Sequence, residues 1–244
     1  MDEMQTNNRV ILCGTPLSSP VFSHASRLEP FYTFPLEVAR LSGTVDTINV
    51  LLREELLPEL KPSRAGLIRI AGEVRSFNNH SGEGSKLVIS VFARELSPPE
   101  TPVWVNEVEL TGTLCKSPNR RTTPMGREIC DLMLAVNRLY GRSDYLPCIV
   151  WGQNARRAAL WDVGTRVHLL GRIQSREYVK KLDEETTEKR IAYEVSVSKL
   201  ELIENRMKSQ KTTFETLKSE NEDIDVTETV INLKSAEMNY EAAL

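Results

Sequence analysis

Four of the aromatic residues and eight of the basic residues between positions 120 and 181 of this 244-residue sequence form an interleaved set. Flat aromatic rings can stack against unpaired nucleobases, and basic side chains can neutralise the phosphates between those bases. The combination predicts a binding surface for single-stranded nucleic acid. The rings are those of Tyr140, Tyr145, Trp151 and Tyr178. The basic residues are Arg120, Arg121, Arg138, Arg142, Arg172, Arg176, Lys180 and Lys181.

Motifs for other chemistry are missing from the sequence. It contains no Gly-rich phosphate loop, no G-x-S-x-G and no H-E-x-x-H, so we expect a protein without catalytic activity. Four cysteines lie far apart, with no C-x-x-C pair or nearby histidine that could complete a zinc site. We therefore expect reduced thiols, no metal and no cofactor. The absence of a long apolar run and of a signal-like start predicts a cytoplasmic protein that does not enter a membrane.

The net charge is distributed unevenly along the chain, and its distribution indicates a partner better than its sum does. The whole chain carries −3, from 31 basic and 34 acidic residues, and an acidic balance by itself argues against a nucleic-acid binder. Residues 103–203 carry +3, whereas residues 1–102 carry −2 and residues 204–244 carry −4. The basic part therefore predicts a negatively charged ligand for that part of the chain alone.

An internal repeat organises the chain. At an offset of 98 residues, segment 8–20 aligns with segment 106–118, and seven of the thirteen aligned positions are identical. The same offset later aligns Arg40 with Arg138. A repeat of this length predicts two copies of one structural unit. The copies correspond to domains 7–97 and 103–203, joined by a Pro-rich linker and followed by a tail, 204–244.

Apolar residues alternate along most of each copy, which is typical of β-strands. Segments 53–60 and 154–161 instead have helical spacing, and each falls between the third and fourth strands of its copy. This order predicts an all-β fold of two tandem five-stranded OB-fold barrels, each with one short helix between strands 3 and 4. An immunoglobulin-like sandwich, with about seven strands and no internal helix, fits less well. The acidic tail, without Gly or Pro, predicts a helical or disordered segment.

The second copy resembles bacterial single-stranded DNA-binding proteins. The resemblance is carried by four blocks in the family's order, NEVELTGTLCKSP, LAVNR, CIVWG and GRIQSREY. It implies that Tyr140, Tyr145, Trp151 and Tyr178 stack on bases. It also implies a protein that coats and protects single-stranded DNA at the bacterial nucleoid during replication, recombination or repair. The family's acidic Pro-Phe tip, which recruits replication and repair proteins, is replaced here by AEMNYEAAL, which puts such partners in doubt.

The first copy resembles the same domain more weakly. At the positions aligned with the four rings it has Ser42, Thr47, Arg53 and Asn79, with Phe77 as the nearest substitute ring. We therefore expect a degenerate, architectural barrel that pairs with the second barrel as an intramolecular pseudo-dimer, as identical subunits pair in the family. A homodimer of the whole chain remains an alternative. Basic residues that could still touch phosphates in this copy are Arg40, Arg69 and Arg75.

Two other functions use the same barrel. One is a protein-interaction module similar to primosomal replication protein N, which acts in replication restart. A pure scaffold has no need of four aromatic rings on one face, which favours nucleic-acid binding. The other is RNA binding, since base stacking does not sense the 2′-hydroxyl group.

Overall fold

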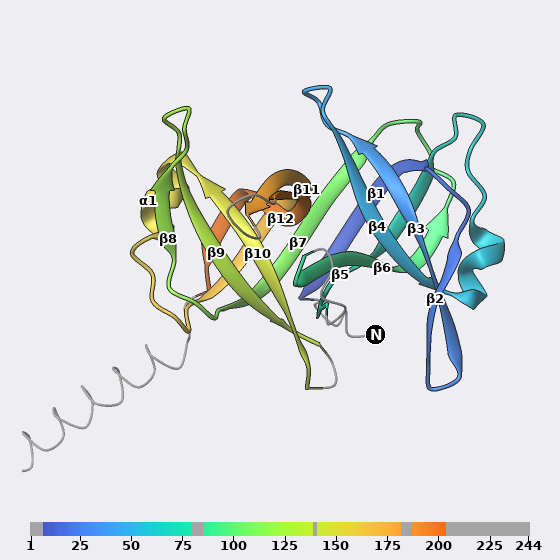
Figure 1. Ribbon diagram of the computed structural model, residues 1–244, viewed down its shortest axis with the longest axis horizontal. Coiled ribbons are helices and arrows are strands. Elements are labelled where there is room, and N and C mark those ends of the chain that lie inside the picture. The colour runs from blue at the N-terminus through green and yellow to red at the C-terminus, as the bar shows by residue number, and fades with distance from the viewer. Residues whose placement is uncertain (1–6, 80–84, 139–140, 182–186, 204–244) are drawn as a thin grey trace, which may run out of the picture. The chain divides into compact units, whose positions relative to one another are not determined.

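A computed structural model of the chain describes residues 7–79, 85–138, 141–181 and 187–203, without the side chains of 179–181, 188 and 189. The tail expected over 204–244 lies outside these residues. Within the described part, β-strands dominate, and twelve of them form one continuous hydrogen-bonded sheet (Figure 1). The sheet closes on itself twice and so makes two barrels.

The first barrel follows the strand order β3, β4, β6, β5, β1, and it closes where β1 pairs with β3 at Thr15 and Glu37. A short strand, β2, extends β3 outside the closure, and a 3-10 helix, η1, follows β4. The bounds are β1 Asn8–Pro16, β2 Val21–Ser26, β3 Glu29–Ala39, β4 Val45–Arg53, η1 Glu54–Glu59, β5 Ile68–Asn78 and β6 Leu87–Ser97.

The second barrel repeats this topology. Its closure pairs β7 with β9 at Thr113 and Ala135, which stand 98 residues after the closing pair of the first barrel. Strand β8 extends β9, and helix α1 follows β10. The bounds are β7 Val105–Leu114, β8 Asn119–Thr122, β9 Glu128–Asn137, β10 Ser143–Trp151, α1 Gly152–Ala158, β11 Arg166–Lys181 and β12 Thr187–Leu202.

Closure of each barrel explains why both copies have a glycine at the same position, Gly14 in the first and Gly112 in the second. A Cβ atom on Gly14 would lie 2.2 Å from the carbonyl oxygen of Glu37, and one on Gly112 would lie 2.6 Å from that of Ala135. Both distances are far below van der Waals contact, so any side chain here would push the first and second strands of the barrel apart. Glycine is therefore required at this position of the repeat.

The predicted fold class is confirmed, with two differences in detail. Each closed barrel has five strands, but a short sixth strand, β2 or β8, extends its second strand and was not expected. The helical segment of the first copy is a 3-10 helix, because Pro58 inside it removes an amide donor and disfavours an α-helix. The helix of the second copy begins at Gly152 and ends at Ala158, earlier than the apolar spacing suggested.

The two barrels share the contact between β1 and β7, which run antiparallel with Val10 opposite Val108. These two valines are equivalent in the repeat, and the pairs on either side are related in the same way. The contact is therefore isologous, the geometry by which identical subunits pair around a twofold axis.

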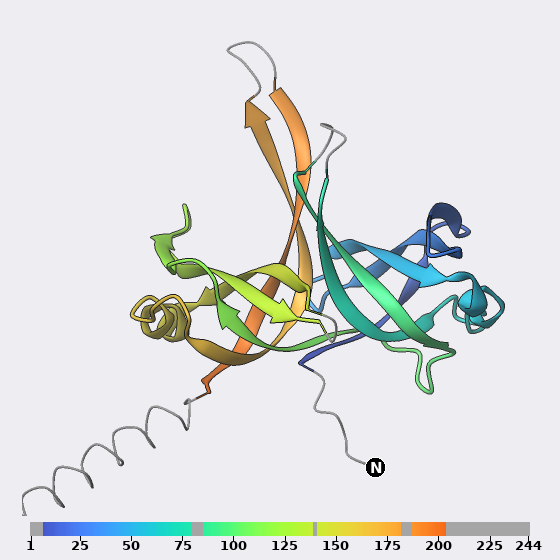
Figure 2. The ribbon, with the colours of Figure 1, turned by 90° about the horizontal axis from the view of Figure 1, so that it is seen from below.

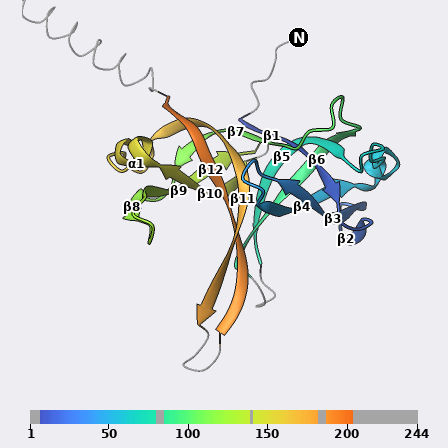
Figure 3. The same ribbon diagram turned by 90° about the horizontal axis from the view of Figure 1, so that it is seen from above.

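A second contact joins the long hairpins. Figures 2 and 3 show that the β5–β6 hairpin runs beside the longer β11–β12 hairpin. The Ser85 hydroxyl, just before β6, donates a hydrogen bond to the carbonyl oxygen of Ile191 on β12 (2.9 Å). The Tyr193 hydroxyl on β12 donates another to the carbonyl oxygen of Thr47 on β4, outside the β5–β6 hairpin (2.9 Å). The β11–β12 hairpin thus adds contacts between the barrels to those of β1 with β7.

All four cysteines are free; Cys115 is half-buried, and Cys13, Cys130 and Cys148 are buried. In the described part of the chain, His, Cys, Asp and Glu side chains form no cluster that could hold a metal ion. No helix among the described residues is long and apolar enough to cross a membrane.

Candidate nucleic-acid interface

Tyr145 and Trp151 lie near the two ends of β10, on its outer face. They are six positions apart, so in a strand of period two both side chains leave on the same side. The residues between them in the other register, Leu146, Cys148 and Val150, are buried in the core. Tyr145 is 51% exposed, so a large part of its ring is open to a ligand.

Trp151 is half-buried and one edge of its ring is fixed. Its indole Nε1 donates a hydrogen bond to the hydroxyl oxygen of Ser196 on β12 (3.2 Å). Ser196 in turn stands opposite Arg172 of β11 in the strand register. Trp151 and Arg172 therefore share one outer face, with a single strand between them. Gly152 follows Trp151 with a φ of 58°, which permits the turn from β10 into α1.

Strand β11 contributes a row of side chains to the same face. Arg172, Arg176 and Tyr178 leave the strand on the side opposite to the buried Ile173, and both arginines are exposed while Tyr178 is half-buried. Neither arginine forms an ion pair with any described residue. Gln174, between them, is buried and donates a hydrogen bond to Glu194 (2.7 Å). This face thus combines three aromatic rings with two arginines that have no carboxylate partner there.

The structure gives less information about the other residues predicted to bind nucleic acid. Arg120 on β8 and Arg142 in the turn before β10 are exposed. Arg121 forms an ion pair with Asp131 (2.6 Å), a surface contact that a phosphate can replace at small cost. Tyr140 and the side chains of Lys180 and Lys181 lie outside the described residues. The roles of these residues in binding remain predictions.

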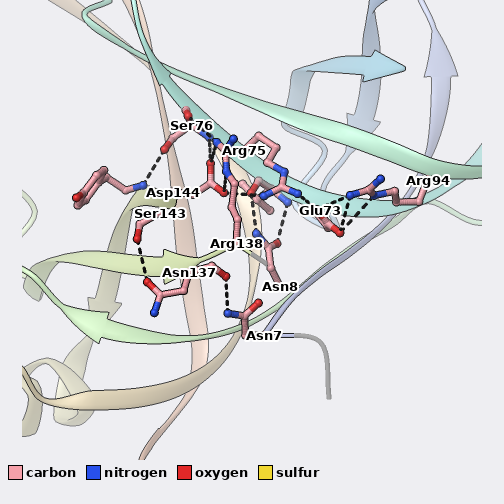
Figure 4. Close-up of polar contacts among 12 residues, drawn as sticks. Asn7, Asn8, Glu73, Arg75, Ser76, Arg94, Asn137, Arg138, Ser143 and Asp144 are labelled. Atoms are coloured by element: carbon pink, nitrogen blue, oxygen red, sulfur yellow. Dashed lines mark hydrogen bonds and ion pairs between the residues drawn. The ribbon is translucent and has the colours of Figure 1, made fainter. Parts of the chain in front are cut away.

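Arg138 has a structural task that sequence reasoning did not foresee. Its guanidinium group binds the carboxylate of Asp144 (Nε to Oδ2, 2.8 Å) and donates to the carbonyl oxygen of Ser76 in the other barrel (3.2 Å). Asp144 is fully buried, accepts a hydrogen bond from the backbone amide of Ser76 (2.7 Å) and pairs with Arg75 (3.0 Å). Figure 4 shows these groups meeting between the barrels. Arg138 therefore joins the two barrels.

The same contact occurs a second time in the opposite direction. Asp46 of the first barrel is fully buried and bound by Arg40. It accepts hydrogen bonds from the backbone amide (2.7 Å) and the hydroxyl (2.9 Å) of Ser175 in the second barrel. Asp46 and Asp144 are equivalent in the repeat, so each barrel inserts one buried carboxylate into the other. We call these two contacts the reciprocal carboxylate contacts.

Both carboxylates are held in the ionised form. Burial alone would raise the pKa of Asp144, but hydrogen bonds from Arg138, the Ser76 amide and Arg75 outweigh burial and lower it. Burial likewise opposes ionisation of Asp46, and the hydrogen bonds from Arg40 and Ser175 lower its pKa as well.

The first of these contacts also positions a predicted stacking residue. The backbone amide of Tyr145, next to Asp144, donates a hydrogen bond to the Ser76 hydroxyl (2.7 Å). Ser76 is itself buried on β5 of the first barrel. The first barrel thus holds the strand end from which the Tyr145 ring projects.

The repeat contained a signal for these contacts. Arg40 and Arg138 are identical at one offset, and Asp46 and Asp144 are identical at the same offset. The four ring positions, in contrast, differ between the copies. A charged pair kept in both copies indicates a task that both copies share, and joining the barrels is such a task.

Similarity to known proteins is clearest in the second barrel. Residues 105–203 match the model of the "Single-strand binding protein family". Single-stranded DNA-binding protein 3 of Streptococcus agalactiae serotype V is 30% identical over 115 residues, which cover 44% of this chain and 80% of that protein. Single-stranded DNA-binding protein B of Bacillus subtilis is 38% identical over 80 residues, covering 30% of this chain and 71% of that protein.

Similarity to solved structures extends over both barrels. The wild-type single-stranded DNA binding protein from Thermus aquaticus superposes with a TM-score of 0.64 at 24% identity, covering 81% of this chain and 93% of that chain. A deletion mutant of the Thermus aquaticus protein gives a TM-score of 0.63 at 22% identity. A share of 81% exceeds the length of either barrel, so the tandem arrangement belongs to the common fold.

Proposed function

This chain belongs to the single-strand binding protein family, and we propose that it coats and protects single-stranded DNA in bacterial replication, recombination or repair. It acts without catalysis, by stacking bases on aromatic rings and by neutralising phosphates. Its place is the bacterial cytoplasm, on DNA exposed at the nucleoid. The second barrel, residues 103–203, provides the binding surface.

One observation carries this proposal: the outer face of β10 and β11 brings Tyr145, Trp151 and Tyr178 together with Arg172 and Arg176. Tyr145 is half-exposed, and the two arginines are exposed without a carboxylate partner among the described residues. Rings that accept any base, beside cations that follow a phosphate backbone, are the features that binding without sequence preference requires.

A fluorescence titration tests the proposal. Oligo-dT, the matching RNA and a duplex are each added to the intact protein while Trp and Tyr emission is recorded. Quenching by oligo-dT at concentrations where the duplex has no effect is the expected result. Equal affinity for the duplex would remove the proposal, and preference for the RNA strand would change its ligand.

Phosphate contacts of Arg172 and Arg176 predict a change in salt dependence. Replacing either by alanine should lower the slope of log K against log salt by about 0.7, because one phosphate contact to a single strand is lost. Titrations at several salt concentrations measure the slope. Arg156→Ala is the matched control, since Arg156 lies on α1 and pairs with Glu128. An unchanged slope in the Arg172 and Arg176 variants would exclude them from the binding surface.

The first barrel, residues 7–97, is proposed to be architectural toward this surface and to form a pseudo-dimer with the second. The pairing of β1 with β7 and the reciprocal carboxylate contacts support this role. Arg40 and Arg75 bind those carboxylates, so replacing both would disturb the pairing as well as any phosphate contact. Arg69 pairs with Glu95 at the surface of the first barrel, so replacing Arg69 alone tests a phosphate contact there without disturbing the pairing of the barrels.

Because Ser76 of the first barrel holds the backbone of Tyr145, a substitution at Ser76 should weaken DNA binding by the second barrel. Ser76→Ala removes the acceptor for the Tyr145 amide and should weaken oligo-dT binding by about 2- to 10-fold, the value of one hydrogen bond. Ser175→Ala is the matched control from the other barrel, because its hydroxyl binds Asp46 instead. Equal losses in both variants would show that only general stability had changed.

A further inference from the structure

The outer face of the first barrel carries a series of aromatic rings in mutual contact. The His24 and Phe31 rings are nearly parallel, with centroids 4.9 Å apart and an interplanar angle of 6°. Phe31 and Phe92 follow at 6.1 Å, and the Arg94 guanidinium carbon lies 4.5 Å from the centroid of Phe92. We call the three rings, those of His24, Phe31 and Phe92, the ring ladder, and Arg94 lies beside it. The three rings come from β2, β3 and β6; β2 pairs with β3, and β4 lies between β3 and β6.

The ring ladder stands at the place that Trp151 occupies in the second barrel. Trp151 aligns with Arg53, and Phe31 is opposite Arg53 in the strand register. In the parallel pairing of β4 with β6, Phe92 is opposite Leu51; in the second barrel, Ser196, the partner of Trp151, holds the equivalent position. A position-by-position comparison of the two copies finds no ring at Arg53 on β4. The rings of the first barrel lie instead on β3 and β6, the strands on either side of β4.

Exposure increases along the ladder toward the solvent. Phe92 is 8% exposed and forms its base, Phe31 is half-buried, and His24 on the edge strand β2 is exposed. Packing between rings accounts for the buried Phe92. It does not account for an exposed imidazole stacked on Phe31, which presents a flat face to the solvent.

Two guanidinium groups beside the ladder, those of Arg53 and Arg94, can exchange a carboxylate partner for a phosphate. Arg94 is 45% exposed and pairs with Glu73 at 3.3 Å. Arg53 is 39% exposed and pairs with Glu29 (3.4 Å) and Glu55 (3.5 Å). Exposed ion pairs such as those of Arg53 contribute about 0 to 1 kcal/mol, so a phosphate can replace Glu29 or Glu55 at small cost. Glu73 is only 23% exposed, but it is also bound by Arg75 and keeps that partner when Arg94 binds a phosphate.

We propose that the ring ladder is a second nucleobase-binding surface. Unpaired bases of single-stranded DNA stack on His24 and Phe31, while Arg53 and Arg94 meet the adjoining phosphates. This inference rests on the proposed function of the second barrel and extends it: the first barrel contributes contacts of its own to a long strand, in addition to its architectural role.

Two lengths of DNA test the proposal on the intact chain. A dT oligomer of about 8 nucleotides fits one barrel, and one of about 40 nucleotides can reach both. The double variant His24→Ala/Phe31→Ala should weaken binding of the long oligomer by about 5-fold or more and reduce the number of nucleotides covered per protein. Binding of the short oligomer, which the second barrel takes more tightly, should change by less than about 2-fold.

Two control variants accompany the test. Phe22→Ala lies on the same strand β2, but Phe22 packs edge-on against Tyr32 and not against the ladder, so long-oligomer binding should be retained. His24→Tyr/Phe31→Tyr keeps two rings and should restore most of the affinity. Thermal unfolding of each variant separates a loss of contacts from a loss of fold.

Photo-crosslinking with oligomers that carry 5-iodouracil gives an independent measurement. Cross-links to peptides containing His24 or Phe31, next to those from the second barrel, are expected. Equal long-oligomer binding by wild type and His24→Ala/Phe31→Ala, with cross-links confined to residues 103–203, would overturn the inference and leave the proposed function intact. Failure of the wild type to bind either oligomer would instead overturn the proposed function, and the inference with it.

Discussion

Replacing Tyr145 by alanine is expected to weaken binding of oligo-dT by about 5- to 150-fold. The expectation follows from stacking energies of about 1 to 3 kcal/mol per base. Tyr145 is the most exposed described ring of the second barrel's face, and its backbone is held by Ser76, so the ring offers a positioned surface rather than a mobile one. Fluorescence anisotropy with labelled oligo-dT measures the effect, since it does not depend on the emission of the ring that is removed.

Thr47→Ala is the matched control for this variant. Thr47 stands at the aligned position of the first barrel, is half-buried, and contacts Tyr193 through its backbone oxygen, which the substitution keeps. Binding should therefore stay within about 2-fold of wild type. If Tyr145→Ala bound as tightly as wild type, the outer face of β10 would not be the base-stacking surface.

Replacing Asp144 by alanine is expected to lower the free energy of unfolding by about 3 to 5 kcal/mol. The substitution leaves Arg138 and Arg75, which are 28% and 17% exposed, without their shared carboxylate. It also leaves the buried amide of Ser76 without an acceptor. Urea unfolding followed by circular dichroism measures the loss. Asp131→Asn, which breaks the surface pair with Arg121, should cost about 1 kcal/mol or less.

Acid should reveal the same contact in the wild type. The folded-state pKa values of Asp144 and Asp46 lie below the unfolded value of about 3.9, so ionised carboxylates stabilise the folded chain. Their contribution is complete above that value and is lost as the pH falls through the lower, folded-state pKa. Wild type should therefore lose more stability than Asp144→Ala on acidification below about pH 4. Parallel losses in the two proteins would contradict the assignment.

Much of the fold could be predicted from the sequence because it depends on local patterns repeated at a fixed offset. Alternating apolar residues predict the strands, and the offset of 98 predicts that the two barrels are equivalent, down to the closing pairs Thr15 with Glu37 and Thr113 with Ala135. The short strands β2 and β8 were not predicted, because all their residues are exposed and carry no alternation in burial.

The candidate site could be predicted in part, for reasons that differ between residues. Exposed rings and cations on β10 and β11 follow from alternation within one strand. The task of Arg138 does not, because its contact with Ser76 joins residues 62 positions apart in different barrels. The ring ladder was missed because alignment compares position with position, whereas Phe31 and Phe92 lie on the strands beside Arg53.

The twofold pairing of β1 with β7 also determines how a bound strand can run. A dimer of identical subunits presents the same surface twice, so a DNA strand and the same strand reversed from 5′ to 3′ meet equivalent contacts. Here the backbone keeps that symmetry around Val10 and Val108, while the side chains on the two outer faces break it. A strand that lies across both barrels, as proposed above, would therefore meet a different order of contacts in each direction, and the DNA would be bound with one preferred polarity.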